Sequence, residues 1–129
     1  MGAKEKALAL HGRGFNCAQS VLGALGEYTG LDEKTALAVS GGFGGGVRCG
    51  EICGACSGAV MALGLASPYS DGEDAAARGK IARAAGAFTR QFAADQGCLR
   101  CVDLKRSGRP CDALIAYAAE QAEEILKNQ

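Results

Sequence analysis

A run of three cysteines strongly constrains the fold of this chain. Cys49, Cys53 and Cys56 are separated by four and three residues, the steps that return a side chain to the same face of an α-helix. At about 100° per residue, their thiols would form a stripe roughly 60° wide on that helix. Converging thiols can bind a metal ion or an iron–sulfur cluster, or can act as a redox-active dithiol. The run therefore predicts a cysteine-bearing helix with sulfur chemistry.

The rest of the chain also predicts helices. Asn16 and Asp32 are suitable N-caps, and no window shows the alternation with β-branched residues that is typical of strands. The expected helices cover residues 4–11, 17–28, a segment from Asp32 to the glycine-rich loop 41–46, 51–65, 74–95 and 110–125. A short basic segment, 98–109, precedes the last helix. We predict an all-α fold: a compact bundle of five or six helices in a single domain of residues 1–129, with the glycine-rich loop before the cysteine helix.

Glycine is unusually frequent for such a bundle. Gly50, Gly54 and Gly58 recur every four residues on the expected cysteine helix, where each glycine costs about 1 kcal/mol relative to alanine. A ridge without side chains lets another backbone approach closely, either for tight helix packing alone or to make room for a site. The loop 41–46 lacks the spacing of nucleotide-binding loops. We expect it to bring the backbone near the sulfur site.

Charge and hydropathy exclude several functional classes. Fourteen basic and fourteen acidic residues leave no net charge that would attract nucleic acid. The most apolar stretch, 59–66, is much shorter than the roughly 20 residues of a transmembrane helix, and the N-terminus lacks a secretion signal. We therefore expect a cytoplasmic protein without nucleic-acid partners or membrane insertion. In a reducing compartment, seven cysteines favour metal or catalytic use over structural disulfides.

Four further cysteines are available to complete the site. Cys17 and Cys111 are expected at helix N-termini, where the amides and the helix dipole lower the pKa of a thiol. Cys98 and Cys101 form a Cys-x-x-Cys pair, a spacing shared by redox dithiols and metal knuckles. Basic side chains in 98–109 would stabilise thiolates, unless the segment is simply a solvated loop. All seven cysteines are thus candidate metal ligands.

Some familiar sulfur sites are excluded. The Cys-x3-Cys-x2-Cys spacing also occurs in radical S-adenosylmethionine enzymes, but these need an α/β barrel and a much longer chain. The one histidine, His11, is far from any cysteine pair, which excludes a c-type haem motif and a Cys2His2 zinc finger.

Taken together, these elements resemble the C-GCAxxG-C-C family, small cysteine-rich proteins to which redox activity is attributed. The resemblance covers about residues 4–126 and is carried by Phe15-Asn16-Cys17-Ala18-Gln19-Ser20-Val21, Gly-Glu-Ile-Cys53-Gly54-Ala55-x-x-Gly58, Cys101-x-x-Leu104 and Cys111. It implies four functional, catalytic cysteines: Cys17, Cys53, Cys101 and Cys111. Cys49, Cys56 and Cys98 are additions to the family pattern. Related domains attached to haem-binding segments imply a role in electron transfer.

Two hypotheses follow from these patterns. In the first, the protein is a small redox protein that uses either an iron–sulfur cluster or a dithiol/disulfide set, and we prefer the cluster. The expected cofactor-binding residues are Cys49, Cys53 and Cys56. In the second, the thiols bind zinc or copper without electron transfer. Inert, buried structural thiols are the remaining alternative. We expect a redox partner, which the sequence does not identify. The patterns leave open whether the protein forms a homodimer. No substrate-binding signature assigns an enzyme activity.

Overall fold

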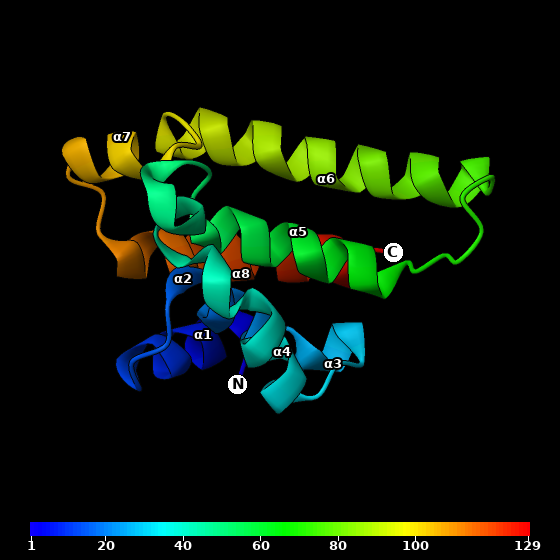
Figure 1. Cartoon of the computed structure of the whole chain (residues 1–129), viewed down its shortest axis with the longest axis horizontal. Coiled ribbons are helices and arrows are strands. Elements are labelled where there is room, and N and C mark those ends of the chain that lie inside the picture. Colours follow the sequence, from blue (N-terminus) through cyan, green and yellow to red (C-terminus); the bar gives the residue numbers. More distant parts are fainter.

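A computed structural model describes all residues, 1–129, and confirms the all-α prediction (Figure 1). There are eight α-helices rather than five or six, and no strand. The α-helices are α1 (Ala3–Gly12), α2 (Cys17–Ala24), α3 (Gly26–Thr29), α4 (Glu33–Ser40), α5 (Gly54–Ala66), α6 (Ala75–Gln96), α7 (Cys101–Arg106) and α8 (Cys111–Lys127). A 3₁₀ turn, η1 (Gly41–Phe43), and a π-type turn, η2 (Gly46–Gly50), lie between α4 and α5.

Side-chain caps begin several of these helices where the sequence predicts. The Asn16 side chain accepts a hydrogen bond from the backbone N–H of Gln19 (3.0 Å), and the Gln19 side chain accepts one from the N–H of Asn16 (3.1 Å). This reciprocal pair is a capping box. Asp32 and Asp74 each accept a hydrogen bond from the N–H three residues later. The caps therefore place the starts of α2, α4 and α6.

Two differences explain the larger helix count. The expected helix 17–28 ends at Ala24, because Leu25 leaves the helical conformation (φ −102°, ψ 16°) and α3 continues as a separate turn. The basic segment 98–109 is not only a connection, since it contains α7, whose Leu104 is fully buried.

The core lies where α5 packs against α2, α8 and α6, with α1 packed on α2 and α8. Small side chains dominate these contacts, and many alanines are fully buried. Examples in α2, α5 and α8 are Ala18, Ala55, Ala59, Ala62, Ala118, Ala119 and Ala122. Helices with such surfaces can approach closely, which is how a chain with few aromatic residues fills its interior.

Two of the predicted ridge glycines make the approach of α2 to α5 possible. A Cβ atom on Gly58 would lie 2.6 Å from the carbonyl oxygen of Ala18, and one on Gly54 would lie 3.1 Å from the Ala18 nitrogen. A side chain on Gly58 would clash with the backbone of α2, and one on Gly54 would be tightly crowded against it. Gly50 is not part of this ridge, because it precedes α5 and has a left-handed φ of 75°. The predicted close packing is confirmed, but the ridge is one glycine shorter.

Helix α6 is long and is anchored near its C-terminal end. It runs across the top of the view in Figure 1, and its only buried side chains are Phe88 and Phe92. The Phe92 ring lies 6.1 Å from the Phe88 ring and 5.7 Å from the Tyr117 ring of α8, the latter pair edge-to-face. The N-terminal half of α6 contributes no buried residue.

None of the eight helices combines the length and the apolar character that are needed to cross a membrane.

Candidate functional site

The predicted stripe of three thiols on one helix is wrong. Helix α5 begins at Gly54 and not at residue 51; Cys53 is its N-cap, with extended backbone (φ −52°, ψ 131°). Cys49 lies in the preceding turn and is exposed. The helix cannot extend back through this turn, because Val47 and Arg48 have positive φ angles of 56° and 61°. Cys53 and Cys56 are buried as expected, but Cys49 does not join them.

This turn brings backbone against the sulfur site, as the sequence predicts for the glycine-rich loop. Four consecutive residues, 45–48, are in the left-handed region, which costs a non-glycine residue about 1–2 kcal/mol. The turn is closed by a hydrogen bond from the N–H of Glu51 to the carbonyl of Gly46 (3.0 Å). A Cβ on Gly46 would lie 2.8 Å from the Cβ of Cys101, so only glycine allows this approach.

A single antiparallel bridge holds Cys53 and Cys101 next to each other. The N–H of Cys53 donates to the carbonyl of Leu99 (2.8 Å), and the N–H of Cys101 donates to the carbonyl of Glu51 (2.6 Å). On the outer side, the guanidinium of Arg100 forms an ion pair with Glu51 (3.1 Å). The starts of α5 and α7 are therefore joined through their backbones.

The four cysteines that the family resemblance singles out share one cavity. It has a volume of about 40 Å³ and will be called the thiol cavity. Each cysteine comes from a different helix start: Cys53 is the N-cap of α5, and the other three are the first residues of their helices. The lining residues are Cys17, Cys53, Cys101, Cys111, Gly45, Gly54, Leu104, Lys105 and Leu114. The expected gathering of these four cysteines is thus present.

Burial, rather than the helix dipole, dominates the pKa values of Cys17 and Cys53. Burial, together with the smaller effects of the neighbouring Cys111 and Cys53, raises the pKa of Cys17 to about 12. Cys101 acts on the Cys17 pKa in the same direction. Burial also raises the pKa of Cys53, although hydrogen bonds from backbone N–H groups of α5 oppose part of the rise. The predicted lowering of the Cys17 pKa is therefore wrong.

These raised pKa values predict that the protein loses stability at alkaline pH. The pKa values of Cys17 and Cys56 are about 12 in the folded protein, against a reference value of 9.0. Below pH 9 both states keep the protons, so the contribution of these thiols to stability is fully present. Between pH 9 and about 12 the unfolded chain ionises first, and the free energy of unfolding should fall. Urea unfolding of reduced protein at several pH values measures this.

A Cys17→Ala/Cys56→Ala protein is the control for that experiment. Tyr28, whose pKa burial and the nearby Glu123 raise to about 12, also contributes to an alkaline loss of stability and remains in the control. The double variant should therefore show a shallower decline than the wild type. Identical declines would contradict the raised thiol pKa values.

The structure does not bring the remaining three cysteines into the thiol cavity. Cys49 is exposed and Cys98 is half-buried. Cys56 is buried at the edge of a separate apolar pocket of about 430 Å³, the Cys56 pocket. The other residues that line this pocket are Phe43, Val47, Ile52, Ser57, Val60, Met61, Thr89 and Leu99.

The thiols are close without forming a bond or a ligand set. All seven cysteines are free, and no group of three or more His, Cys, Asp or Glu side chains is arranged to hold a metal ion. The donor type suits a soft metal, but the arrangement of the donors does not fit one as it stands.

One basic side chain of the segment 98–109 reaches the thiol cavity. Lys105 lines it, whereas Arg100 and Arg106 form ion pairs with Asp103 and Arg109 donates to Gln96. The expected positive charge beside the thiols is therefore supplied by Lys105. The arginines belong to a surface network, which is the alternative that the sequence left open.

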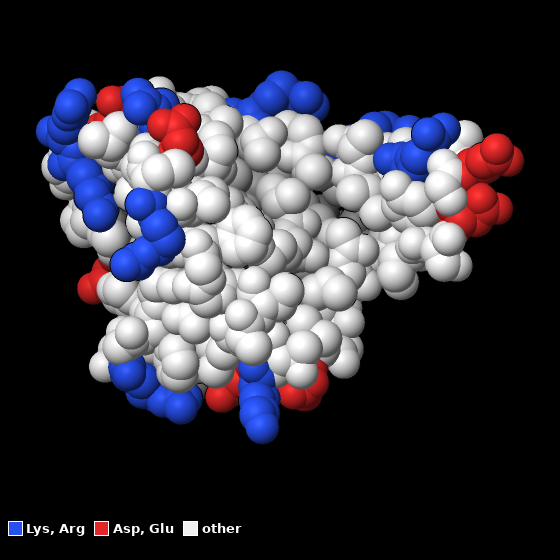
Figure 2. All heavy atoms as spheres, in the orientation of Figure 1, with Lys and Arg blue, Asp and Glu red and all other residues white.

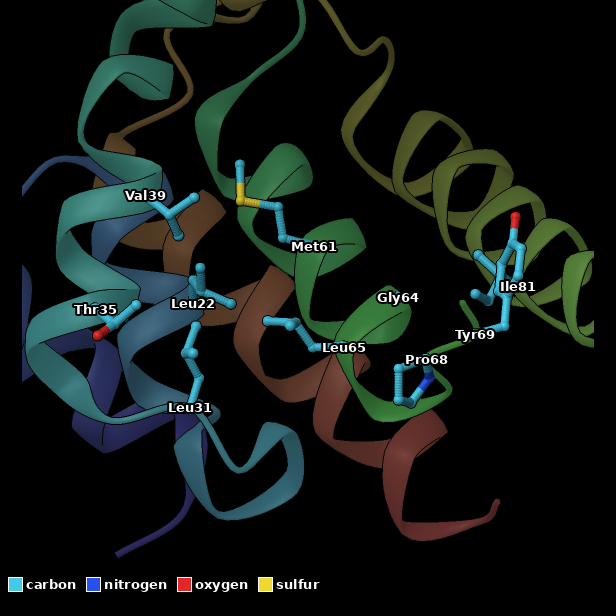
Figure 3. A pocket seen from close by; sticks show the side chains of 10 residues that line it. All are labelled: Leu22, Leu31, Thr35, Val39, Met61, Gly64, Leu65, Pro68, Tyr69 and Ile81. Atoms are coloured by element: carbon cyan, nitrogen blue, oxygen red, sulfur yellow. The ribbon is translucent and has the colours of Figure 1, made fainter. Parts of the chain in front are cut away.

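The largest pocket of the molecule lies away from the thiols and was not predicted from the sequence. It has a volume of about 550 Å³ and lies between α4, α5 and the N-terminal half of α6 (Figure 3). Few charged side chains cover the centre of this face (Figure 2). The lining residues are Leu22, Leu31, Thr35, Val39, Met61, Gly64, Leu65, Pro68, Tyr69 and Ile81. One of these residues, Val39 of α4, is an exposed apolar side chain, but its exposure is not visible in the sequence.

The fold and the thiol cavity define a small all-helical protein in which cysteines from four helix starts share one site. A model of the family described as "Putative redox-active protein (C_GCAxxG_C_C)" matches residues 15–125. The chain belongs to this family. Comparison with curated proteins and with solved structures found no significant match.

Proposed function

We propose that this protein is a thiol redox protein that interconverts a dithiol and a disulfide in the thiol cavity, with Cys17 and Cys111 as the first pair. The observation that carries the proposal is that Cys17 and Cys111 line one small cavity, which Cys53 and Cys101 also line. Among these thiols, Cys111 is the neighbour that most raises the pKa of Cys17. The family description, redox-active, supports the same class of function.

Oxidation of this pair needs a disulfide as the oxidant, either on a partner protein or on a small thiol compound. A thiolate attacks one sulfur of that disulfide and forms a mixed disulfide, and the first oxidant thiol leaves. The second cysteine then attacks, closing the Cys17–Cys111 disulfide and releasing the second oxidant thiol. Two electrons pass to the oxidant, and its two thiols take up the two protons. Lys105 at the cavity supplies positive charge that stabilises the attacking thiolate.

The raised pKa of Cys17 favours a reducing couple. A low thiol pKa stabilises the reduced form as thiolate and makes a pair oxidising. Cys17 has the opposite shift, because burial disfavours its thiolate. We therefore expect a midpoint potential near the cytoplasmic poise, about −220 to −320 mV.

Redox titration tests this proposal. Protein purified anaerobically is equilibrated with dithiothreitol or glutathione buffers, and the free thiols are counted by mass after alkylation. We expect reversible loss of two thiols in the wild type and in the control Cys49→Ser, which alters an exposed thiol outside the cavity. Cys17→Ser should abolish this transition. A wild type without reversible oxidation, or a transition that Cys17→Ser leaves unchanged, would overturn the proposal.

The second candidate is a protein that binds metal at this site, either an iron–sulfur cluster or a zinc or copper ion. Four thiols at helix starts and the nearby Lys105 suit a group of net negative charge such as a thiolate-ligated metal. The side chains would have to rotate toward one another to become ligands, which is why we prefer the thiol couple. The absorption spectrum of anaerobically purified protein and its iron, zinc, copper and sulfide content distinguish the metal-loaded form from the thiol couple. Stoichiometric metal would favour the metal-loaded form, and metal-free protein would exclude it.

A further inference from the structure

We propose that Cys56, which lies outside the family's four-cysteine pattern, is a resolving thiol for Cys53. The two would form a second dithiol, Cys53-x-x-Cys56, that takes over the disulfide from the thiol cavity and presents it to the Cys56 pocket. This inference rests on the thiol redox function proposed above and adds a step and a residue to it.

The position of the pair on α5 carries the first part of the argument. Cys53 is the N-cap of this 13-residue helix, and Cys56 is its third residue. From the radius and rise of an α-helix, Cα atoms three residues apart lie about 5 Å apart, within the range of about 4.4–6.8 Å between the Cα atoms of disulfide-bonded cysteines. Both side chains are buried, at 3% and 1% exposure. A Cys-x-x-Cys pair at a helix start is an arrangement that supports reversible disulfide chemistry.

The second part is that the two sulfurs border different cavities. Cys53 lines the thiol cavity, with Cys17 and Cys111. Cys56 lines the Cys56 pocket, together with Val47, Ile52 and other apolar residues. The first turn of α5 thus forms a wall between the two cavities, and the pair spans it. A disulfide on this pair could be reached from the Cys56 pocket, whose volume of about 430 Å³ accommodates a side chain or a small thiol compound.

The exchange balances within the chain. The Cys53 thiolate first attacks the Cys17 sulfur of the Cys17–Cys111 disulfide, and a Cys53–Cys17 bond forms. Cys111 is the leaving group and takes up the proton that Cys53 lost. The Cys56 thiolate then attacks the Cys53 sulfur; a Cys53–Cys56 bond forms, and Cys17 leaves with the proton from Cys56. Cys17 lies near the start of α5, since its Cβ is 3.3 Å from the point that a Cβ on Gly54, the residue after Cys53, would occupy.

Disulfide mapping tests the proposal without altering Cys56. Reduced Cys49→Ser protein is oxidised with an equimolar amount of oxidised glutathione, alkylated at successive times and digested with trypsin without reduction. In this background the tryptic peptide 49–78 contains only Cys53 and Cys56. A Cys17–Cys111 bond joins the peptides 14–34 and 107–127, whereas a Cys53–Cys56 bond leaves 49–78 unlinked, unalkylated and two hydrogens lighter.

We expect the joined peptides to appear first and the lighter 49–78 peptide to replace them. In a Cys49→Ser/Cys56→Ala protein, the joined peptides should persist, with a Cys53–Cys17 mixed disulfide as the only further product. Joined peptides without the lighter 49–78 peptide in the Cys49→Ser protein would overturn this inference and leave the proposed function standing. Absence of both products would overturn the proposed function and this inference with it.

Discussion

A Gly58→Ala variant is expected to lose about 1–3 kcal/mol of unfolding free energy, the usual cost of an overpacked core. The loss should occur even though alanine is a better helix former than glycine by about 1 kcal/mol. The new Cβ would lie 2.6 Å from the carbonyl oxygen of Ala18, which is backbone and cannot rotate away. Helix α2 must therefore shift. Urea unfolding of the reduced protein measures the change.

Gly64→Ala is the matched control for this variant. It adds the same methyl group to the same helix, but no atom lies within 4 Å of the new Cβ. We expect it to gain up to about 1 kcal/mol of stability from helix propensity alone. If Gly58→Ala were as stable as Gly64→Ala, the close approach of α2 to α5 would be wrong, and with it the position of Cys17 beside Cys53.

Replacing Phe92 with alanine should cost about 3–5 kcal/mol, the range for removal of a buried aromatic ring. Phe92 is fully buried and packs against Phe88 on its own helix and Tyr117 on α8. It is one of only two buried side chains on α6. Urea unfolding gives the loss, and faster amide hydrogen exchange along α6 would show that this helix has lost its anchor.

Ile81→Ala provides the comparison on the same helix. Ile81 lines the large apolar pocket and is only partly buried, so its truncation should cost less than about 1.5 kcal/mol. Equal losses for the two variants would contradict the anchoring of α6 through its C-terminal half.

Local sequence signals predicted those parts of the fold that local interactions control. Asn16 and Asp32 cap helices with their own side chains, and both starts were predicted. The start of α7 was not, because Cys101 is held by a hydrogen bond to Glu51, fifty residues earlier. The break at Leu25 was also missed, although Gly23 and Gly26 on either side of it were a local signal. Pairings such as that of Cys101 with Glu51 depend on tertiary packing, which helical periodicity does not describe.

The candidate site was predicted in part, for similar reasons. The family resemblance selected the four cysteines that share the thiol cavity. The three-thiol stripe failed because Val47 and Arg48 adopt left-handed conformations that such residues usually avoid; the glycines before them were the available signal. The pKa of Cys17 was predicted in the wrong direction because the helix dipole is visible in sequence, whereas burial of the thiol is not.

The wide separation of the four cysteines along the chain determines when the thiol cavity can form during biosynthesis. Cys17 and Cys53 emerge from the ribosome before Cys101 and Cys111 have been made. The last helix must also dock, and its Glu123 is bonded to the N–H of Ala3 at the other end of the chain (3.2 Å). The early thiols therefore stay unshielded from the time they emerge until the last helix has been made and has docked. During that interval the redox state of their surroundings can act on the nascent chain.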